Sequence, residues 1–267
     1  MIATLAVATV VLSNAFGRVE ISTLGAQVTS YAPAGGGEVL FMPRDRDFTK
    51  DREMHGGIPV CWPWFGRFGA PGSRMHGLVR YAQWTVAEKS DSKAVLTLVS
   101  SPATRKAWPY DFSLAYTVEL GEALKLALVA TNTSKEPFAV TEGFHPYFAV
   151  ADPTKAVVKG LKDDLRVYPG IDGGHACASG GAYRLVDVAG GRTVEIVSNA
   201  ERKLVVWNPG PDWADWKPSC NLGKDDWRKF VCMEPTVIGR ENAIVLKPGE
   251  RSEFTMTVRR KRDNRRR

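Results

Sequence analysis

The sequence predicts an all-β protein built as a single domain, and three observations support this prediction. Short runs of β-branched and aromatic residues recur at regular intervals, with turn residues between them. No long stretch keeps the period of an amphipathic helix. The chain of 267 residues shows no internal repeat, linker or change of composition before its last nine residues. Such spacing favours a β-sandwich or a barrel.

The first predicted strands form a hairpin. Val7 to Leu12 and Arg18 to Ser22 are β-rich runs, and the four residues NAFG between them are a hairpin signal. Gln27 to Ala32 alternates and ends at Pro33, and a run of three glycines then turns the chain into Val39 to Met42. These runs predict a small antiparallel sheet at the start of the chain.

The remaining predicted strands follow at short intervals: Tyr81–Glu88, Ala94–Ser100, Phe112–Leu120, Ala123–Thr131, Phe138–Thr141, Thr193–Val197, Leu204–Trp207, Phe230–Met233, Ala243–Leu246 and Phe254–Val258. A long polar insertion at 212–229 contains tryptophans and is expected to hold one short helical turn. We therefore expect one sandwich domain over residues 1–258 and a basic, disordered tail over 259–267.

The net charge of +7 belongs mostly to the tail. Residues 259–267 (RRKRDNRRR) hold seven Lys/Arg and one Asp, a charge of +6, which leaves about +1 for the remaining body. A near-neutral body argues against a surface that binds nucleic acid. A basic terminal run is usually solvated, and we interpret this one in that way.

The cysteines and the apolar segments indicate a cytoplasmic protein. Cys61, Cys177, Cys220 and Cys232 form no CxxC pair, so zinc ribbons and redox motifs are disfavoured and free thiols in a reducing compartment are expected. The N-terminus lacks the basic region of a signal peptide. No apolar segment approaches the roughly 20 residues that span a bilayer. The sequence thus predicts no membrane contact.

The stretch from Gly56 to Arg80 (GGIPVCWPWFGRFGAPGSRMHGLVR) is the most unusual in the chain. Its 25 residues hold six Gly and three Pro, and they fit neither a helix nor an alternating strand. Loops of this length are uncommon unless they have a function. Trp62, Trp64 and Phe65 are flat side chains of the kind that stack on sugar rings. The alternative is a loop that packs on its own aromatics.

Two titratable side chains are placed at predicted strand ends. His145 precedes Pro146, which should end a strand, and Glu234 follows three apolar strand residues and precedes Pro235. A histidine and a glutamate at two strand ends could form a general acid–base pair. The alternatives are a core histidine satisfied by backbone and a glutamate buried in an ion pair.

Other chemistry-bearing motifs are absent from the sequence. It holds no GxSxG elbow, no P-loop, no HExxH and no GxGxxG after a strand. His55 and His76 are too loosely placed to predict a metal site. We therefore expect no metal and no cofactor.

The motifs together resemble the aldose 1-epimerase (galactose mutarotase-like) superfamily and, within it, the glucose-6-phosphate 1-epimerase branch. Each motif is weak alone, but seven in the right order are specific. They are LGAQV at 24–28, GGIPVCWPWFG at 56–66, HGLVR at 76–80, FHPYF at 144–148, VVWNP at 205–209, FVCME at 230–234 and KPGE at 247–250.

The resemblance implies a β-supersandwich with a cleft on one sheet face. It implies that His145 is the general acid and Glu234 the general base, and that His76 and Arg80 bind the substrate. The partner would be a small sugar or sugar phosphate, and we expect a monomer. Trp62 and its neighbours would supply an apolar wall for the sugar.

The sequence departs from the family at two places. The residue before GGIP is commonly Arg in that branch and helps to hold the sugar phosphate, whereas here it is His55, which lacks the bidentate fork. Arg80, Arg67 or Arg74 could compensate. The family usually has a substrate-contacting Asp between the two catalytic motifs.

In this sequence the first choice for that aspartate is Asp164 and the second is Asp172. Three functional hypotheses therefore stay open. The first is a mutarotase that acts on a hexose 6-phosphate. The second is the same chemistry on an unphosphorylated or different sugar. The third is a non-catalytic carbohydrate-binding sandwich.

Overall fold

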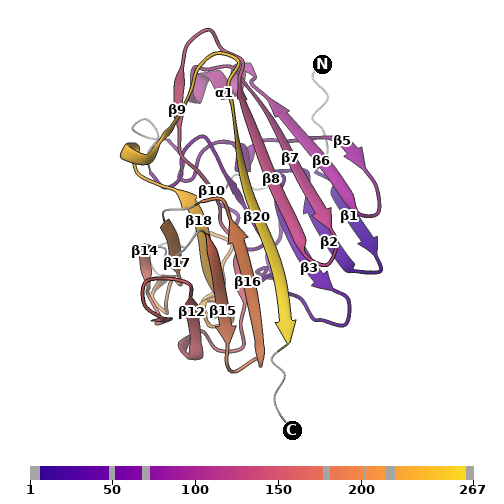
Figure 1. Cartoon of the computed structure of the whole chain (residues 1–267), viewed down its shortest axis with the longest axis vertical. Coiled ribbons are helices and arrows are strands. Elements are labelled where there is room, and N and C mark those ends of the chain that lie inside the picture. Colours follow the sequence, from indigo (N-terminus) through magenta and orange to yellow (C-terminus); the bar gives the residue numbers. More distant parts are fainter. Residues whose placement is uncertain are drawn as a thin grey trace.

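A computed structural model of the chain describes residues 7–47, 52–67, 73–176, 181–200, 203–213 and 220–262. Antiparallel strands dominate it (Figure 1). The N-terminal three-stranded sheet contains β1 (Thr9–Asn14), β2 (Gly17–Ser22) and β3 (Val28–Pro33). Asn14 pairs with Gly17, so the predicted hairpin is confirmed.

A nine-stranded antiparallel sheet forms one layer of the sandwich, in the order β13-β12-β15-β16-β20-β8-β7-β6-β5. Its strands are β5 (Thr85–Lys89), β6 (Lys93–Val99), β7 (Phe112–Leu120), β8 (Leu124–Asn132), β12 (Ala156–Lys159), β13 (Leu165–Arg166), β15 (Ala182–Asp187), β16 (Arg192–Ser198) and β20 (Arg251–Arg262). Every second side chain of β7 and β8 is buried, which is the pattern of a sheet with one solvated face.

The second large sheet has six strands and carries the residues of interest. Its order is β14-β17-β18-β10-β4, with β11 also paired to β18. The strands are β4 (Val60–Cys61), β10 (Glu142–Phe144), β11 (Tyr147–Ala149), β14 (Asp172–Ala176), β17 (Lys203–Trp207) and β18 (Phe230–Val237). A two-stranded sheet of β9 (Phe138–Val140) and β19 (Ile244–Leu246) completes the set.

The helical segments are short and lie between strands. Those that lie wholly within the described residues are α1 (Pro102–Ala107), η1 (Val79–Tyr81), η2 (Pro153–Lys155), η3 (Asp226–Lys229) and η4 (Arg240–Asn242). Ser101 caps α1 through a reciprocal capping box with Thr104. No strand prediction covered α1, and the helical turn expected in the 212–229 insertion corresponds to η3.

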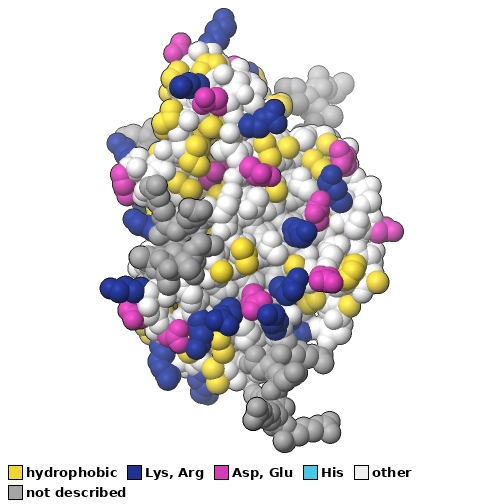
Figure 2. Space-filling model, in the orientation of Figure 1, with side chains coloured by type: hydrophobic (Ala, Val, Ile, Leu, Met, Phe, Trp, Pro, Cys, Tyr) yellow, Lys and Arg dark blue, Asp and Glu magenta, His cyan; other side chains and the backbone are white. Residues whose placement is uncertain are grey.

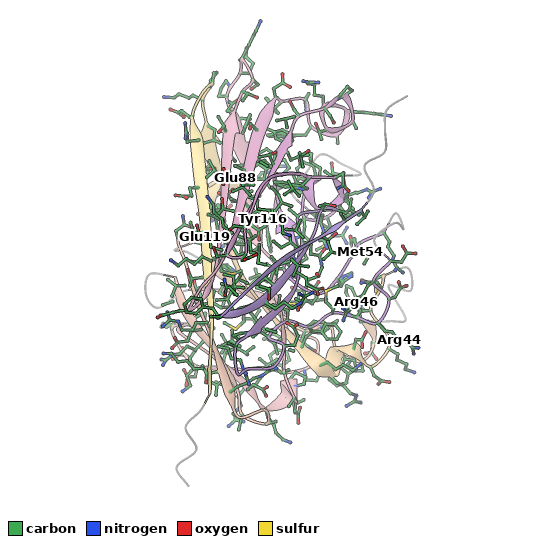
Figure 3. All side chains as sticks on the ribbon, turned by 90° about the vertical axis from the view of Figure 1, so that its right-hand side faces the viewer. Arg44, Arg46, Met54, Glu88, Tyr116 and Glu119 are labelled. Carbon is green, nitrogen blue, oxygen red and sulfur yellow. The ribbon has the colours of Figure 1, made fainter. Side chains whose placement is uncertain are left out.

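The hydrophobic core lies between the nine-stranded sheet and the two sheets that pack against it. Tyr116 of β7 is fully buried there and lies near the centre of the molecule, whereas Arg44 and Arg46 lie at its edge (Figure 3). On the face seen in Figure 2, basic and acidic side chains are interspersed among the described residues. Within the described part of the chain, no helix is long and apolar enough to cross a membrane.

Several predicted boundaries are corrected by the structure. Strand β20 continues to Arg262, so the sandwich includes the first four of the nine residues expected in the tail, and 263–267 lie outside the described residues. Residues 79–81 are a 3₁₀ turn, and β5 begins only at Thr85. Strands β12 to β15 were not predicted, because this charged and glycine-rich segment lacks long apolar runs.

Candidate active site

A cavity of about 430 Å³ opens on the face of the six-stranded sheet that is turned away from the nine-stranded sheet. Ligand sites in proteins commonly have volumes of this order, about 300–1,000 Å³. Its lining includes both predicted catalytic residues, His145 and Glu234. Strand alternation places Glu234 here, since Val231 and Met233 of β18 pack in the core and their neighbours must point to the opposite face.

His145 lies in the short break between β10 and β11, as its position before Pro146 predicted. Its backbone N–H donates to the Pro59 carbonyl at 3.0 Å, which joins the break to the 56–66 loop. The ring stacks on Tyr147, with centroids 4.9 Å apart and planes inclined by 9°. Backbone and neighbouring ring together fix the orientation of the imidazole.

The His145 imidazole faces the Glu234 carboxylate inside the cavity. The distance from Nε2 of His145 to Oε1 of Glu234 is 3.5 Å. Glu234 is 1% exposed and His145 is 6% exposed. The two sequence motifs, which are 89 residues apart in the chain, are therefore brought together by the pairing of β11 with β18.

Burial changes the acidity of both groups. It raises the pKa of the Glu234 carboxyl well above its ordinary value, the nearby Asp172 charge raises it further, and Arg80 acts in the opposite direction. Burial also lowers the pKa of the His145 imidazole well below its ordinary value, and His76, Arg80 and His55 act in the same direction. Burial therefore favours the uncharged form of each group over the ion pair.

His76 borders the cavity beside His145, with ring centroids 5.0 Å apart. Its backbone has a positive φ of 61°, and Gly77 follows at 84°. A Cβ at Gly77 would lie 2.1 Å from the Trp62 carbonyl oxygen, so the turn requires glycine. The backbone N–H of Gly66 donates to Nδ1 of His76 at 3.2 Å, which places the proton of the neutral ring on Nε2.

Arg80 lies in the same lining, as the resemblance implied, and so does His55, which stands where the family commonly has Arg. The Arg80 guanidinium is buried and donates to the Met54 carbonyl at 2.7 Å. Nδ1 of His55 lies 3.2 Å from Oδ1 of Asn221, which also accepts from the His55 backbone N–H. An arginine keeps its charge when buried, so Arg80 supplies a fixed positive charge to the cavity.

Two predicted substrate contacts are corrected. Trp62 is fully buried among Trp108, Phe112 and Phe138 on the core side of the molecule and does not line the cavity. Asp164 is exposed, forms an ion pair with Lys159 at 2.9 Å, and also lies outside the lining.

The structure places other residues where these two were expected. Asp172, the second choice, begins β14 and lines the cavity. Phe65, one of the loop aromatics singled out from the sequence, lines the cavity. The rest of the aromatic lining comes from Trp207 and Trp213, whose rings lie 5.1 Å apart, and from Tyr147, and these three were not predicted from the sequence. Strand alternation could have predicted Trp207, because it lies on the same strand face as Val205, which also lines the cavity.

The cavity carries charges of both signs. Glu53, Asp172 and Glu234 line it together with Arg67 and Arg80. The ligand atoms of His145, Cys232 and Glu234 all lie within 4.8 Å of one another, so a metal ion is geometrically conceivable at this one place among the described residues. Cys61, Cys220 and Cys232 are free thiols, as expected, and Cys177 lies outside the described residues.

The sequence is similar to a known family and to named relatives. The family model for aldose 1-epimerase matches residues 8–171. A candidate glucose-6-phosphate 1-epimerase of Salmonella typhimurium is 30% identical over 79% of this chain and 76% of that protein. Proteins of the same description from Escherichia coli and the grass Cenchrus ciliaris are also 30% identical, over 84% and 86% of this chain and 80% and 78% of those proteins.

Solved structures show the same fold. A crystal structure of a candidate mutarotase from Salmonella typhimurium has a TM-score of 0.84 at 26% identity and covers 96% of this chain and 91% of that one. A homologue of aldose epimerases from Caenorhabditis elegans has a TM-score of 0.76 at 12% identity and covers 97% of this chain and 100% of that one. The second likeness concerns the fold alone. Both confirm the predicted galactose mutarotase-like β-sandwich.

Proposed function

The chain belongs to the aldose 1-epimerase family, and we propose that it is a glucose-6-phosphate 1-epimerase, which interconverts the α and β anomers of a hexose 6-phosphate. One observation carries the proposal from the family to this molecule: His145 and Glu234 face each other at 3.5 Å inside one cavity. A binding module would not need this pair. The family and the pair together favour an isomerase over the non-catalytic alternative.

The proposed reaction opens and recloses a hemiacetal. The Glu234 carboxylate removes the proton from O1 of the sugar while protonated His145 donates a proton to the ring oxygen, and the C1–O5 bond breaks. Rotation about C1–C2 then presents the other face of the aldehyde. Neutral His145 takes the proton back from the O5 hydroxyl, the ring recloses, and the Glu234 carboxyl returns its proton to O1.

The displaced pKa values suit this reversible chemistry. Since one proton passes from the sugar to Glu234 and another from His145 to the sugar, ring opening exchanges an ion pair for a neutral pair, and reclosure restores the ion pair. Burial penalises the charged forms of both groups, which raises the pKa of Glu234 and lowers that of His145. These shifts stabilise the neutral pair that ring opening produces relative to the ion pair, and the reaction must pass through both states in either direction.

The other lining residues would hold the sugar. In the proposal, Arg80 and His55 receive the 6-phosphate, because Arg80 is a fixed buried cation and His55 can become one by protonation. Trp207 and Trp213 form the apolar wall, and Asp172 and His76 bind sugar hydroxyls. The relatives named above support the phosphate sugar.

One observation favours an unphosphorylated sugar as the second candidate. Three carboxylates, Glu53, Asp172 and Glu234, line the cavity against two arginines, Arg67 and Arg80, so the lining is not strongly positive. The chemistry at the anomeric centre would be the same for either sugar. A cytoplasmic, monomeric enzyme that needs no cofactor stays our prediction from the sequence.

Anomer exchange measured by two-dimensional exchange NMR tests the proposal. The wild type should accelerate exchange of glucose 6-phosphate more than that of glucose, after the uncatalysed rate is subtracted. Arg80→Gln should lower kcat/KM for the phosphate sugar by about 30- to 150-fold, since a charge-assisted contact contributes roughly 2–3 kcal/mol. The rate with glucose should fall much less, through the loss of the Arg80 charge that acts on the pKa of both Glu234 and His145.

Arg74→Gln is the matched control. The Arg74 guanidinium stacks over the Tyr81 ring at 4.4 Å and does not line the cavity, so this variant should keep the wild-type preference. Equal acceleration of both sugars by the wild type would overturn the phosphate assignment and leave the second candidate.

A further inference from the structure

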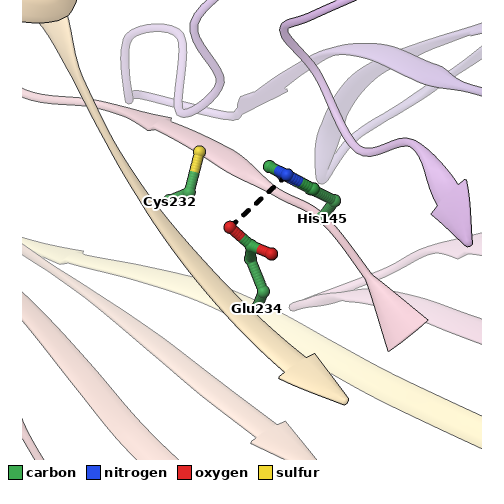
Figure 4. A group of neighbouring side chains, drawn as sticks. All are labelled: His145, Cys232 and Glu234. Carbon is green, nitrogen blue, oxygen red and sulfur yellow. Dashed lines mark ion pairs between the residues drawn. The ribbon is translucent and has the colours of Figure 1, made fainter. Parts of the chain in front are cut away.

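The thiol of Cys232 lies beside the His145–Glu234 pair, and the proposed reaction does not use it. Cys232 and Glu234 are two residues apart on β18 and therefore point to the same face of the sheet. Tyr147 of β11 pairs with Cys232, and His145 precedes Tyr147 by two residues. Figure 4 shows the three side chains converging, with the thiol and the imidazole on the same side of the Glu234 carboxylate.

The three side chains are buried and incompletely satisfied. Cys232 is 0% exposed, Glu234 is 1% exposed and His145 is 6% exposed. Oε1 of Glu234 and Nδ1 of His145 make no hydrogen bond with any described residue. Buried polar atoms without a partner are rare in folded proteins and indicate a missing ligand, water or substrate. The substrate accounts for the pair but not for the adjacent sulfur.

We propose that His145, Cys232 and Glu234 form a binding site for a single Zn²⁺ ion or a chemically similar divalent cation. Their ligand atoms lie within 4.8 Å of one another. Tetrahedral zinc with bonds of about 2.0–2.3 Å holds its ligands roughly 3.3–3.7 Å apart. The His145–Glu234 distance of 3.5 Å meets this requirement already, and small side-chain rotations bring the sulfur into place.

The ligand set selects the class of ion. Thiolate, imidazole and carboxylate together suit zinc, cobalt and cadmium, whereas magnesium and calcium prefer oxygen ligands alone. Three protein ligands leave a fourth position, and the cavity lined by His145 and Glu234 supplies both the entry path and that open position. On binding, the ion displaces the thiol proton of Cys232 and any proton on the pair to solvent.

A bound ion would inhibit the enzyme, and this consequence rests on the proposed function. Zinc would occupy the lone pairs of both groups that must exchange protons with the sugar. The sugar and the ion would compete, because the anomeric centre and the metal need the same two side chains. The proposed metal site is therefore inhibitory, and the bound ion takes no part in catalysis.

Cobalt binding to the metal-free, sugar-free protein tests the site directly, without any assay of activity. The wild type should bind one Co²⁺ and develop a thiolate-to-cobalt charge-transfer band, which zinc should abolish by displacement. Cys232→Ser should lose the band and weaken zinc binding by at least about 10- to 100-fold, as expected when a metal contact is removed. Cys232→Ala gives a second variant with no residual oxygen ligand.

Cys220→Ser is the matched control, since Cys220 is a free and partly exposed thiol outside the cluster. It should keep both the band and the affinity. Anomer exchange then measures the effect on activity. Zinc should inhibit the wild type and Cys220→Ser competitively, whereas Cys232→Ser, compared with its own zinc-free rate, should need at least about 10- to 100-fold more zinc for the same inhibition. Absence of the charge-transfer band in the wild type, or equal zinc affinity in the Cys232 variants, would overturn the proposal.

These readouts separate the site from the proposed function. If cobalt binds through Cys232 but no sugar is turned over, the metal site stands and the epimerase assignment fails. If sugar is turned over but cobalt gives no thiolate band, the epimerase assignment stands and the metal site fails.

Discussion

Two glutamates of the same sheet, Glu142 on β10 and Glu234 on β18, show what distinguishes a buried carboxyl from a catalytic one. Both are almost completely buried, and burial raises the pKa of both, that of Glu142 to about 8. They point to opposite faces. Phe144, two residues after Glu142, packs on Tyr116 and Phe254 in the core, so Glu142 points there too.

The surroundings of the two carboxyls differ. Neither oxygen of Glu142 makes a hydrogen bond with any described residue, and its pKa is displaced by burial alone. Glu234 has His145 at 3.5 Å, the charges of Arg80 and Asp172 nearby, and an open cavity in front of it. Burial supplies the displaced pKa in both places, but only the cavity side adds a partner and access for a ligand.

The largest expected effect concerns the pair on the cavity side. Glu234→Gln and His145→Gln should each lower kcat for anomer exchange by about 10³-fold, or about 4 kcal/mol in the barrier, because each removes one partner of the proton transfer. The double variant should be scarcely slower than either single one, since the two groups act as a unit. Additive losses in a steady-state comparison of the four proteins would contradict the pairing.

Substitution of Glu142, on the core side of the sheet, should change the stability of the protein and not the rate of anomer exchange. The pKa of Glu142 in the folded protein is raised to about 8. The contribution of the protonated carboxyl to the free energy of unfolding is therefore fully present below the ordinary pKa of glutamate and is lost as pH rises through about 8. Glu142→Gln cannot ionise. Its free energy of unfolding should therefore exceed that of the wild type by on the order of 4 kcal/mol at pH 8 and should match it near pH 4.

Urea unfolding of both proteins across this pH range measures the difference. Glu88→Gln is the control, because Glu88 is exposed on β5 and should leave the pH dependence of stability unchanged. If the free energies of unfolding of the wild type and Glu142→Gln differed by the same amount at every pH, the pKa of Glu142 would not be raised in the folded protein.

The smallest expected effect is a shift in a pH profile. The active pair holds one mobile proton, and activity is lost at high pH when that proton leaves. The Asp172 charge raises the pKa of Glu234 and so delays this loss. Asp172→Asn should move the alkaline limb of kcat/KM to lower pH, by about half a unit. Asp164→Asn, at the surface beside Lys159, should not move it.

Sequence reasoning succeeded where one face of a strand meets water. The alternation of β7 and β8 predicted their bounds to within a residue, and Pro146 correctly placed His145 at a strand end. It failed on β18, predicted to end at Met233, because Pro235 indicated a strand end. The strand continues through Pro235, which pairs with Leu204, to Val237.

The site itself was predicted in part, for a physical reason. Residues within recognisable motifs, such as His145, Glu234 and Arg80, reached the cavity as expected. Trp62 did not, because the direction of a side chain in an irregular loop depends on tertiary contacts, here a bridge from Trp62 to Gly77. Asp172 was only the second choice for the substrate-contacting aspartate. It reaches the cavity because β14 pairs with β17, and no local sequence pattern reveals this pairing.

The most direct test compares the two glutamates in one experiment. Exchange NMR on glucose 6-phosphate would be run with the wild type, Glu142→Gln and Glu234→Gln, each shown to be folded by circular dichroism. We predict that Glu142→Gln exchanges the anomers at the wild-type rate, while Glu234→Gln falls close to the uncatalysed rate. Full activity of Glu234→Gln would contradict the central role of the His145–Glu234 pair.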